Sequence, residues 1–174
     1  MTDERFPWYD LADGDDLEQG DIIPGCRCFQ PLRQIEAGET ISMKWQERDL
    51  IVLSQSCDLV KERENLSDVL LASVWKQSEL SGHLATPKGL EDARRGNLPS
   101  IHLLAQADFV GTDPGIRVVD FRSLFTLPTG FLRLQAAASP KRLRLLPPYR
   151  EHLSQAFARF FMRVGLPVNI PAFR

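Results

Sequence analysis

The residues with the greatest chemical potential in this sequence lie around one short apolar stretch. Residues 50–53 are four consecutive apolar residues, and the polar run Ser54-Gln55-Ser56-Cys57-Asp58 follows them directly. Such a stretch is typical of a β-strand that is covered on both faces. Arg48 stands just before it, so a base, a thiol and a carboxylate flank one strand. Because polar residues at the end of a rigid strand often form sites, residues 48–58 are the first candidate.

Three side chains have the chemistry needed for transfer of a phosphate group without a metal. That reaction requires a base for the proton of the attacking hydroxyl, an acid for the leaving oxygen and a cation for the phosphorane charge. Arg48 is the candidate cation, because its planar fork suits phosphate. Asp58 is a candidate base, and His102 a candidate acid or base, because histidine titrates near neutral pH. The structural alternative is that Arg48 and Asp58 pair with each other or with other acids, and that His102 only packs on a strand.

Cys57 next to Asp58 suggests a nucleophile. A catalytic cysteine requires a neighbouring histidine, cation or helix N-terminus to lower its pKa. His83, His102 and His152 are present, but no local spacing ties one of them to Cys57. The alternative is a small thiol at the end of a core strand, with Asp58 capping the turn.

The cysteines also raise the question of zinc. Cys26-x-Cys28, Cys57 and a histidine would make up a Cys₃His set, but structural zinc sites usually show two closely spaced pairs. On an alternating strand Cys26 and Cys28 share one face, as two core positions also would. We therefore expect no metal and no other cofactor.

The composition is typical of one globular domain. The chain has 174 residues, of which 43% are hydrophobic and 25% charged. No apolar run approaches the ~18 residues of a membrane span, and the acidic beginning lacks the pattern of a signal peptide. An odd number of cysteines favours a reducing compartment. We expect a cytoplasmic protein that does not enter a membrane.

The charges are distributed unevenly along the chain. Residues 1–21 contain eight acids and one base, whereas residues 117–174 contain ten bases and two acids. One interpretation is a basic surface for phosphate, such as that of RNA guided by Arg142 and Arg144, or for an acidic partner. The other is that these arginines bind the acidic beginning of the chain, residues 1–19, which is expected to form an N-terminal arm.

The hydrophobic pattern predicts a mainly β fold with a C-terminal helix. Residues 69–75, 101–105 and 118–127 have strand character, and residues 131–135 and 142–146 are expected to be further short strands. Residues 76–99 are polar with weak helical character and are expected to be an insertion. Apolar residues at i, i+3, i+4 and i+7 predict a helix over about 149–164. The expected domain covers residues 20–174, as a strongly bent sheet or barrel.

The order of these segments resembles a known family. Gly20-Asp21-Ile22 opening a strand, followed by Arg48-x-Leu-Ile-Val-Leu-Ser54, is similar to the signature of the MazF/PemK toxins. Residues 69–74, 97–102 and 118–127 are similar to later segments of that family. The resemblance implies a small SH3-like β-barrel, a homodimer, metal-independent endoribonuclease activity and an antitoxin-like or operon-encoded protein partner.

The sequence also departs from the family pattern at functional positions. Arg48 matches the arginine that contacts the scissile phosphate in catalytic members, but Asp49 replaces the proline after it. The catalytic threonine of the family falls on Val74, with Ser73 one residue away. Two hypotheses follow. One is an RNA-binding or RNA-cleaving toxin-type protein that uses Arg48; the other is a catalytically inactive protein-interaction or regulatory subunit of a multi-gene bacterial system.

Overall fold

The protein is mainly β, with its longest α-helix at the C-terminal end of the described chain. The computed structural model describes residues 6–29, 44–61, 66–109 and 113–162. The strands are β1 (Tyr9–Ala12), β2 (Ile22–Phe29), β3 (Trp45–Val52), β4 (Asp68–Lys76), β5 (Ile101–Leu104), β6 (Arg117–Pro128) and β7 (Arg142–Leu145). The α-helices are α1 (Pro87–Arg94), α2 (Thr129–Ala137) and α3 (Tyr149–Phe161), and the 3₁₀ turns are η1 (Ser56–Asp58), η2 (Gln77–Glu79) and η3 (Gly82–Ala85).

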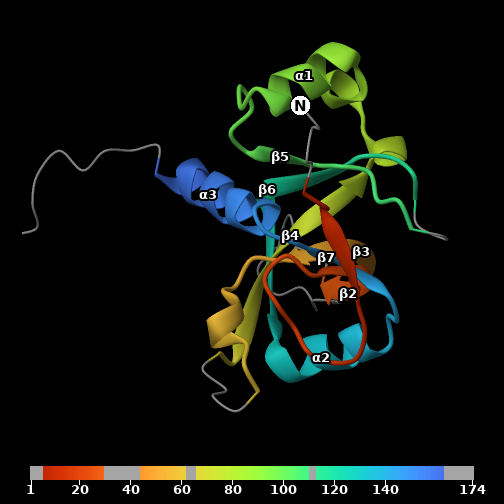
Figure 1. Cartoon of the computed structure of the whole chain (residues 1–174), viewed down its shortest axis with the longest axis vertical. Coiled ribbons are helices and arrows are strands. Elements are labelled where there is room, and N and C mark those ends of the chain that lie inside the picture. The colour runs from red at the N-terminus through yellow and green to blue at the C-terminus, as the bar shows by residue number, and fades with distance from the viewer. Residues whose placement is uncertain (1–5, 30–43, 62–65, 110–112, 163–174) are drawn as a thin grey trace, which may run out of the picture.

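The strands form one five-stranded sheet and one two-stranded ribbon (Figure 1). The sheet is antiparallel with the order β2-β3-β4-β6-β5, and the ribbon pairs β1 with β7. A single antiparallel bridge between Asp21 and Arg144 joins the ribbon to the start of β2. The mainly β class with a C-terminal helix is therefore confirmed, whereas the described strands do not complete a closed barrel.

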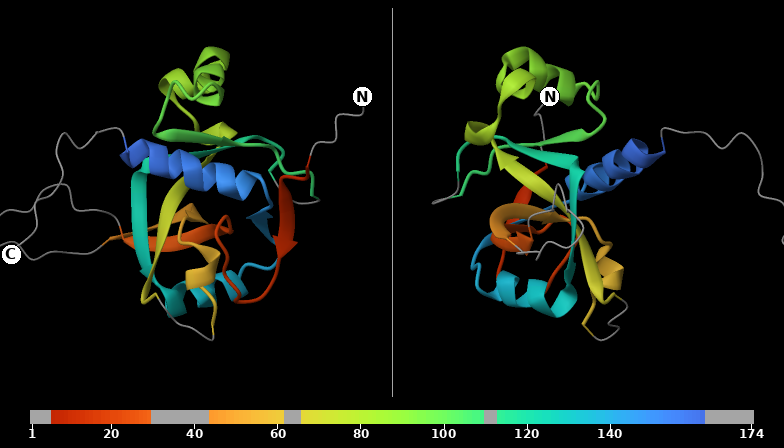
Figure 2. Two further views of the ribbon diagram at one scale, coloured as in Figure 1. Left: turned by 60° about the vertical axis from the view of Figure 1, so that its left-hand side comes forward. Right: turned by 180° about the vertical axis from the view of Figure 1, so that it is seen from behind.

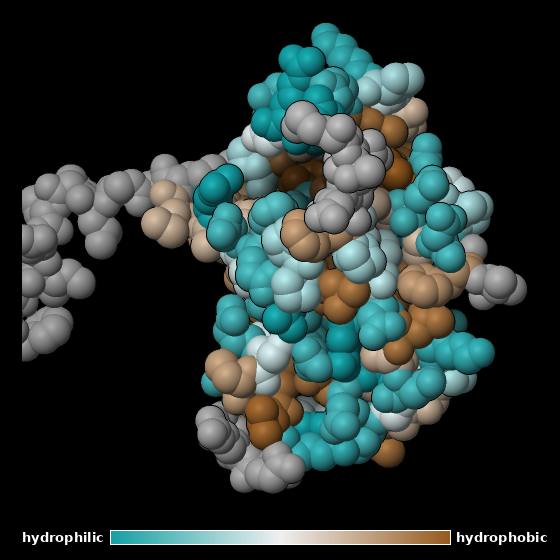
Figure 3. Space-filling view, in the orientation of Figure 1, coloured by the Kyte–Doolittle hydropathy of each residue, from teal (hydrophilic) through white to brown (hydrophobic). Residues whose placement is uncertain are grey.

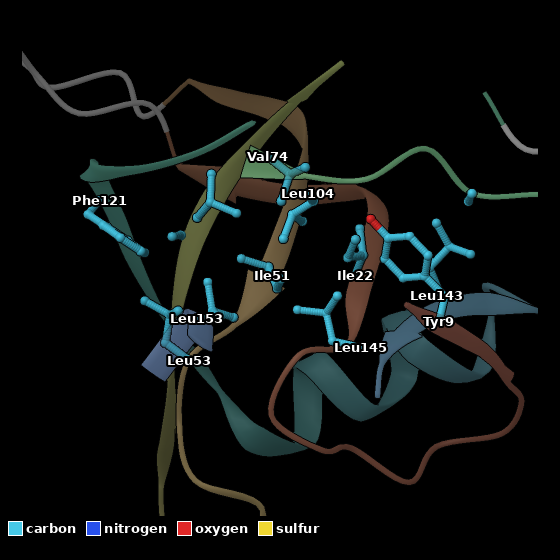
Figure 4. Close-up of a cluster of buried hydrophobic side chains, with 13 residues drawn as sticks. Tyr9, Ile22, Ile51, Leu53, Val74, Leu104, Phe121, Leu143, Leu145 and Leu153 are labelled. Atoms are coloured by element: carbon cyan, nitrogen blue, oxygen red, sulfur yellow. The ribbon is translucent and has the colours of Figure 1, made fainter. Parts of the chain in front are cut away.

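Helix α3 and the ribbon share one interior with the sheet. Ile51, Val74 and Phe121 of the sheet pack with Leu145 of the ribbon and Leu153 of α3 (Figure 4). Helix α3 lies across this face of the sheet (Figure 2). The i, i+3, i+4 stripe of the sequence is the reason, because it places Leu153, Phe157 and Phe160 against the strands.

The opposite face of the sheet is covered by the other two helices. Leu50 and Val52 pack there with Leu132 of α2, while Val118 packs with Ala93 of α1. Residues 131–135 were expected to be a short strand, and this prediction is wrong because they lie inside α2. Five alternating residues do not distinguish a strand from a helix, and Leu132 and Ala136 share the buried side at a spacing of four.

The insertion expected over residues 76–99 begins at the end of β4 and contains η2, η3 and α1. The surface over α1 is largely polar (Figure 3). Thr86 caps α1 by accepting a hydrogen bond from Gly89 N at 3.0 Å, and Pro87 follows at the first helical position. The weak helical character predicted for residues 76–99 therefore corresponds to α1, whose start is fixed by neighbouring residues of the sequence.

The acidic beginning is not a separate arm in its described part, residues 6–19. Strand β1 pairs with β7, Tyr9 is buried, and its hydroxyl donates to Ala105 O at 2.7 Å. Trp8 stacks on Tyr149 of α3 with the ring centroids 3.6 Å apart. The prediction of an arm over residues 1–19 needs this correction, since apolar residues between the acids anchor the segment. No helix in the described ranges is both long and apolar enough to span a bilayer.

Candidate functional site

Arg48 lies on β3 with its guanidinium over an aromatic ring. Its Cζ is 4.7 Å from the centroid of the Trp75 ring, and Nη2 donates to Gln46 Oε1 at 3.1 Å. Nε is buried and has no hydrogen-bond partner among the described residues. No carboxylate of the described residues forms an ion pair with Arg48, so the expected alternative pairing with Asp58 or Asp49 is not present there. Asp49 instead accepts from Gly25 N at 2.9 Å.

The strand opposite Arg48 offers no free hydroxyl. Asp49 pairs with Val74 and Leu50 with Ser73, so Ser73 and Trp75 lie on the face that carries Arg48, while Val74 lies on the other. Ser73 is only 1% exposed, and its hydroxyl shares a 2.8 Å hydrogen bond with Ser123. The family's arginine–threonine arrangement is therefore not reproduced around Arg48.

Cys57 and Asp58 lie beyond the C-terminal end of β3, whereas Arg48 lies in the middle of that strand. Both belong to η1, and the four-residue advance from Arg48 to Val52 alone covers about 13 Å. The Cys57 thiol is exposed and has one hydrogen-bond partner in the described chain, Asp58 Oδ1 at 3.8 Å. The structure thus brings Cys57 and Asp58 together but separates them from Arg48.

The polar run after β3 holds neighbouring segments in place. Gln19 Nε2 donates to Leu53 O at 2.8 Å, and Gln19 N donates to Ser56 Oγ at 3.1 Å. Ser54 Oγ accepts from Leu70 N at 2.9 Å. These bonds satisfy backbone groups where three segments meet, so the composition of the run has a structural cause. Gln19 was missed by sequence reasoning because its partners are more than thirty residues away.

Arg142 and Arg144 are engaged by the acidic beginning of the chain. Arg142 Nε donates to Asp21 Oδ2 at 3.1 Å, with both side chains 0% exposed. Its two terminal nitrogens donate to the carbonyls of Gly14 and Asp16. Arg144 also bonds Asp21, through Nη2 at 2.9 Å. Of the two interpretations of these arginines, the structure shows the contact with the acidic beginning, and releasing a buried arginine from its carboxylate would cost about 3–5 kcal/mol.

The three cysteines do not gather into a metal centre. Cys26 and Cys28 are buried on β2, whereas Cys57 is exposed on η1. In the described parts of the chain, no group of three or more histidine, cysteine or acidic side chains is close enough to hold a metal ion. Burial raises the pKa of the Cys26 thiol to about 12, and it also raises the pKa of Cys28, so both behave as core residues.

His102 lies on β5, the outer strand of the sheet, beside α3. Its ring is 6.3 Å from that of Phe121, and Nε2 is buried without a hydrogen-bond partner in the described structure. Burial, with a smaller contribution from nearby His152, lowers the pKa of His102 from 6.5 to about 4. At neutral pH the ring is therefore uncharged and has spare hydrogen-bonding capacity.

A cavity of about 400 Å³ opens beside His102, between β5, α1 and α3. Its polar lining comes from three elements: Arg94 from α1, His102 from β5, and His152, Gln155 and Arg159 from α3. Arg94 forms an ion pair with Glu91 at 2.6 Å, whereas Arg159 pairs with no carboxylate of the described residues. We call this space the histidine cavity. It gathers two imidazoles and two guanidiniums around an apolar wall of Leu98 and Pro99.

Only His102 of this set was predicted as a site residue. The sequence did contain a signal for the three residues of α3, because His152, Gln155 and Arg159 have the spacing i, i+3 and i+7, which places them on one side of the predicted helix. The sequence could not show that this flank meets β5 or the end of α1, because those contacts are long-range.

The histidine cavity and Arg48 are separate places on the molecule. Register pairs Asp49 with Val74, Val74 with Val119, and Val119 with His102, so three strand spacings of ~4.8 Å separate β3 from β5 by about 14 Å. The His102 side chain shares a face with Asp49, and Arg48 is on the other face. Arg48, His102 and Asp58 therefore do not form the single catalytic group expected from the sequence.

Comparison with known proteins adds no homologue: no family model and no curated protein sequence matches the chain.

Proposed function

We propose that this protein binds RNA and cleaves it without a metal, and that its reaction centre is the histidine cavity. The supporting observation is that His102, His152 and Arg159 line one open cavity of about 400 Å³. Attack of the 2′-hydroxyl on the adjacent phosphate requires a base, an acid and a cation. Two imidazoles and a guanidinium can fill these three roles. The proposal retains the toxin-type activity expected from the resemblance to MazF/PemK proteins but moves the chemistry away from Arg48.

Each group has a defined task in this reaction. His102, neutral at pH 7, takes the proton of the attacking 2′-hydroxyl. His152, exposed at the rim, gives a proton to the departing 5′-oxygen. Arg159 balances the charge of the phosphorane, and Arg94 adds positive potential even while paired with Glu91. One proton is accepted and one donated, leaving a 2′,3′-cyclic phosphate and a free 5′-hydroxyl.

The lowered pKa of His102 is compatible with the role of base. A base with a pKa of about 4 is available at neutral pH but is weak. An RNA phosphate in the cavity places negative charge beside the ring, which favours its protonated form and raises its pKa towards the working pH. Substrate binding therefore strengthens the base when it is needed.

The arrangement of strands supports an SH3-like barrel as the scaffold. The sheet and the β1–β7 ribbon enclose one interior, and the bridge from Asp21 to Arg144 joins them on one side. On the other side, the Tyr9 hydroxyl reaches Ala105 just after β5. At the register shift between Ala72 and Ser73 of β4, residues 121–123 are extra residues of β6, and such a bulge bends its strand, as curling of a sheet requires.

The test is cleavage of a fluorescent single-stranded RNA in the presence of a chelator. His102→Ala and His152→Ala should each reduce the rate by about 10²–10⁴-fold, as loss of a general acid or base does. His83→Ala is the matched control, because His83 is exposed, pairs with Asp92 at 3.0 Å and does not line the cavity. A substrate with 2′-deoxyribose at the cut should be inert. Cleavage that persists in both cavity variants, or depends on added metal, would refute the proposal.

A second function, a protein-interaction module, has its own supporting observation. Phe29 and Trp45 are 60% and 57% exposed, and they border an apolar groove of about 420 Å³ with Phe131. An apolar surface of this kind suits a protein partner with apolar side chains, such as an antitoxin-like or operon-encoded protein. Trp45→Ala should then weaken capture of that partner at least tenfold while leaving RNA cleavage intact. Sedimentation analysis of the same variant would show whether the expected homodimer uses this groove.

A further inference from the structure

Arg48 and Trp75 line a second, smaller cavity on the other face of the sheet. It measures about 210 Å³, and Gly25, Glu47, Asp49, Val74 and Glu79 complete its wall. None of these residues lines the histidine cavity. We call this space the Arg48 cavity.

The charges around the Arg48 cavity disfavour phosphate. Three acidic residues line the cavity with a single arginine, which makes the site unfavourable for a phosphate, although Glu47 and Asp49 direct their carboxylates to the face opposite Arg48. Two have nearby cations: Glu47 is 3.6 Å from Arg27, and Asp49 is 3.6 Å from Lys76. Glu79 accepts the Lys76 backbone N–H at 2.7 Å but forms no ion pair in the described chain.

The remaining hydrogen-bonding capacity belongs to two oppositely charged groups. Arg48 offers a buried Nε without a partner, and Glu79 offers carboxylate oxygens bonded only to a backbone group in the described structure. Both line the same cavity, yet no ion pair joins them. A complementary ligand therefore presents acceptors towards Arg48 and N–H donors towards Glu79.

The shape of the cavity restricts that ligand further. A volume of about 210 Å³ accommodates one flat ring system but not a whole nucleotide. The guanidinium over Trp75 is a planar cation whose N–H donors lie in its plane, so it presents an edge to a flat ligand that carries paired acceptors. Among bases, guanine has two adjacent acceptors, O6 and N7, that suit arginine. It also carries N1–H and N2–H donors on its Watson–Crick edge, which suit a carboxylate.

We propose that the Arg48 cavity binds a single guanine base of RNA, with Arg48 contacting its acceptors and Glu79 its N–H donors. This inference deepens the proposed function, because it gives RNA a base-reading site apart from the reaction centre. Arg48 then selects sequence and takes no part in the chemistry.

Guanosine, which lacks phosphate, is the probe for this cavity. Calorimetric titration of the full-length protein should show guanosine binding at least tenfold tighter than adenosine, cytidine or uridine. Glu79→Gln and Arg48→Lys should each weaken guanosine binding tenfold or more. The first removes the carboxylate that accepts from the N–H donors of guanine, and the second removes the guanidinium that contacts O6 and N7. Asp68→Asn is the matched control, since Asp68 is an exposed acid at the opposite end of β4.

The result can be separated from that of the cleavage test. His102→Ala should bind guanosine like the unaltered protein, whether or not it cleaves RNA. Guanosine binding that depends on Glu79, without any cleavage, would support the base site and refute only the reaction. Failure of guanosine to bind, equal binding of all four nucleosides, or displacement by inorganic phosphate alone would overturn the inference.

Discussion

Replacing Asp21 by asparagine tests whether this buried carboxylate holds Arg142 and Arg144 in place. Asp21 is 0% exposed and accepts hydrogen bonds from both Arg142 and Arg144. Asparagine has nearly the same shape, but it removes the charge and directs an NH₂ group at guanidinium donors. Arg142, whose side chain is also 0% exposed, would then remain buried without its carboxylate.

The expected cost of this change is large. Breaking a buried ion pair by removing one partner costs about 3–5 kcal/mol, against a total stability of about 5–15 kcal/mol for a typical domain. For a chain of this length, about 1 kcal/mol corresponds to roughly 2–4 °C in the unfolding midpoint, so Asp21→Asn should melt roughly 6–20 °C lower. Because the pair is shielded from solvent, added salt should change this difference little.

Urea unfolding followed by circular dichroism measures the effect directly. Asp58→Asn is the control, because Asp58 is partly exposed and the only hydrogen bond of its side chain in the described chain is to the neighbouring thiol. That substitution should change stability by no more than about 0.5 kcal/mol. A cost below about 1 kcal/mol for Asp21→Asn, or one removed by salt, would show that Arg142 and Arg144 are not held as described.

Two further predictions concern titratable groups. The folded-state pKa of His102, about 4, lies below its ordinary value of 6.5, so the fold favours the neutral ring and should lose stability as pH falls through that interval. Between pH 7.5 and pH 5 the unaltered protein should lose about 2 kcal/mol more than His102→Gln in urea unfolding, and parallel pH profiles would contradict this. The second prediction is that a thiol reagent labels one cysteine in the native protein, Cys57, while Cys26 and Cys28 react only on unfolding, because they are buried and their pKa values are raised. Mass spectrometry identifies the labelled residue, and native labelling of Cys26 would be the contrary result.

The features predicted correctly from the sequence are those set by local pattern. Residues 50–53 form the buried end of β3 and the residue after it because their apolar run fits only the interior. The helical stripe after residue 148 gives α3, and its described end at Phe161 is close to the predicted one. Residues 163–164 of the predicted helix lie outside the described residues. Local pattern failed at α2, because its short alternation fits strand and helix equally.

The site depended on contacts that local pattern does not contain. The composition showed an acidic beginning and a basic end, but only the fold decided that Arg142 and Arg144 meet Asp21. It also placed Arg48 and His102 on opposite faces and brought His152 and Arg159 to His102 from a helix fifty residues later.

The sequence by itself determined which residues can act as acids, bases, nucleophiles or cations and which segments are buried, because side-chain chemistry and hydrophobic period are local properties. The tertiary structure alone decided which of those residues share a cavity and which neutralise one another. Burial and ion pairing depend on neighbours brought together by strand register and helix packing. In this protein those neighbours are thirty to more than a hundred residues apart along the chain.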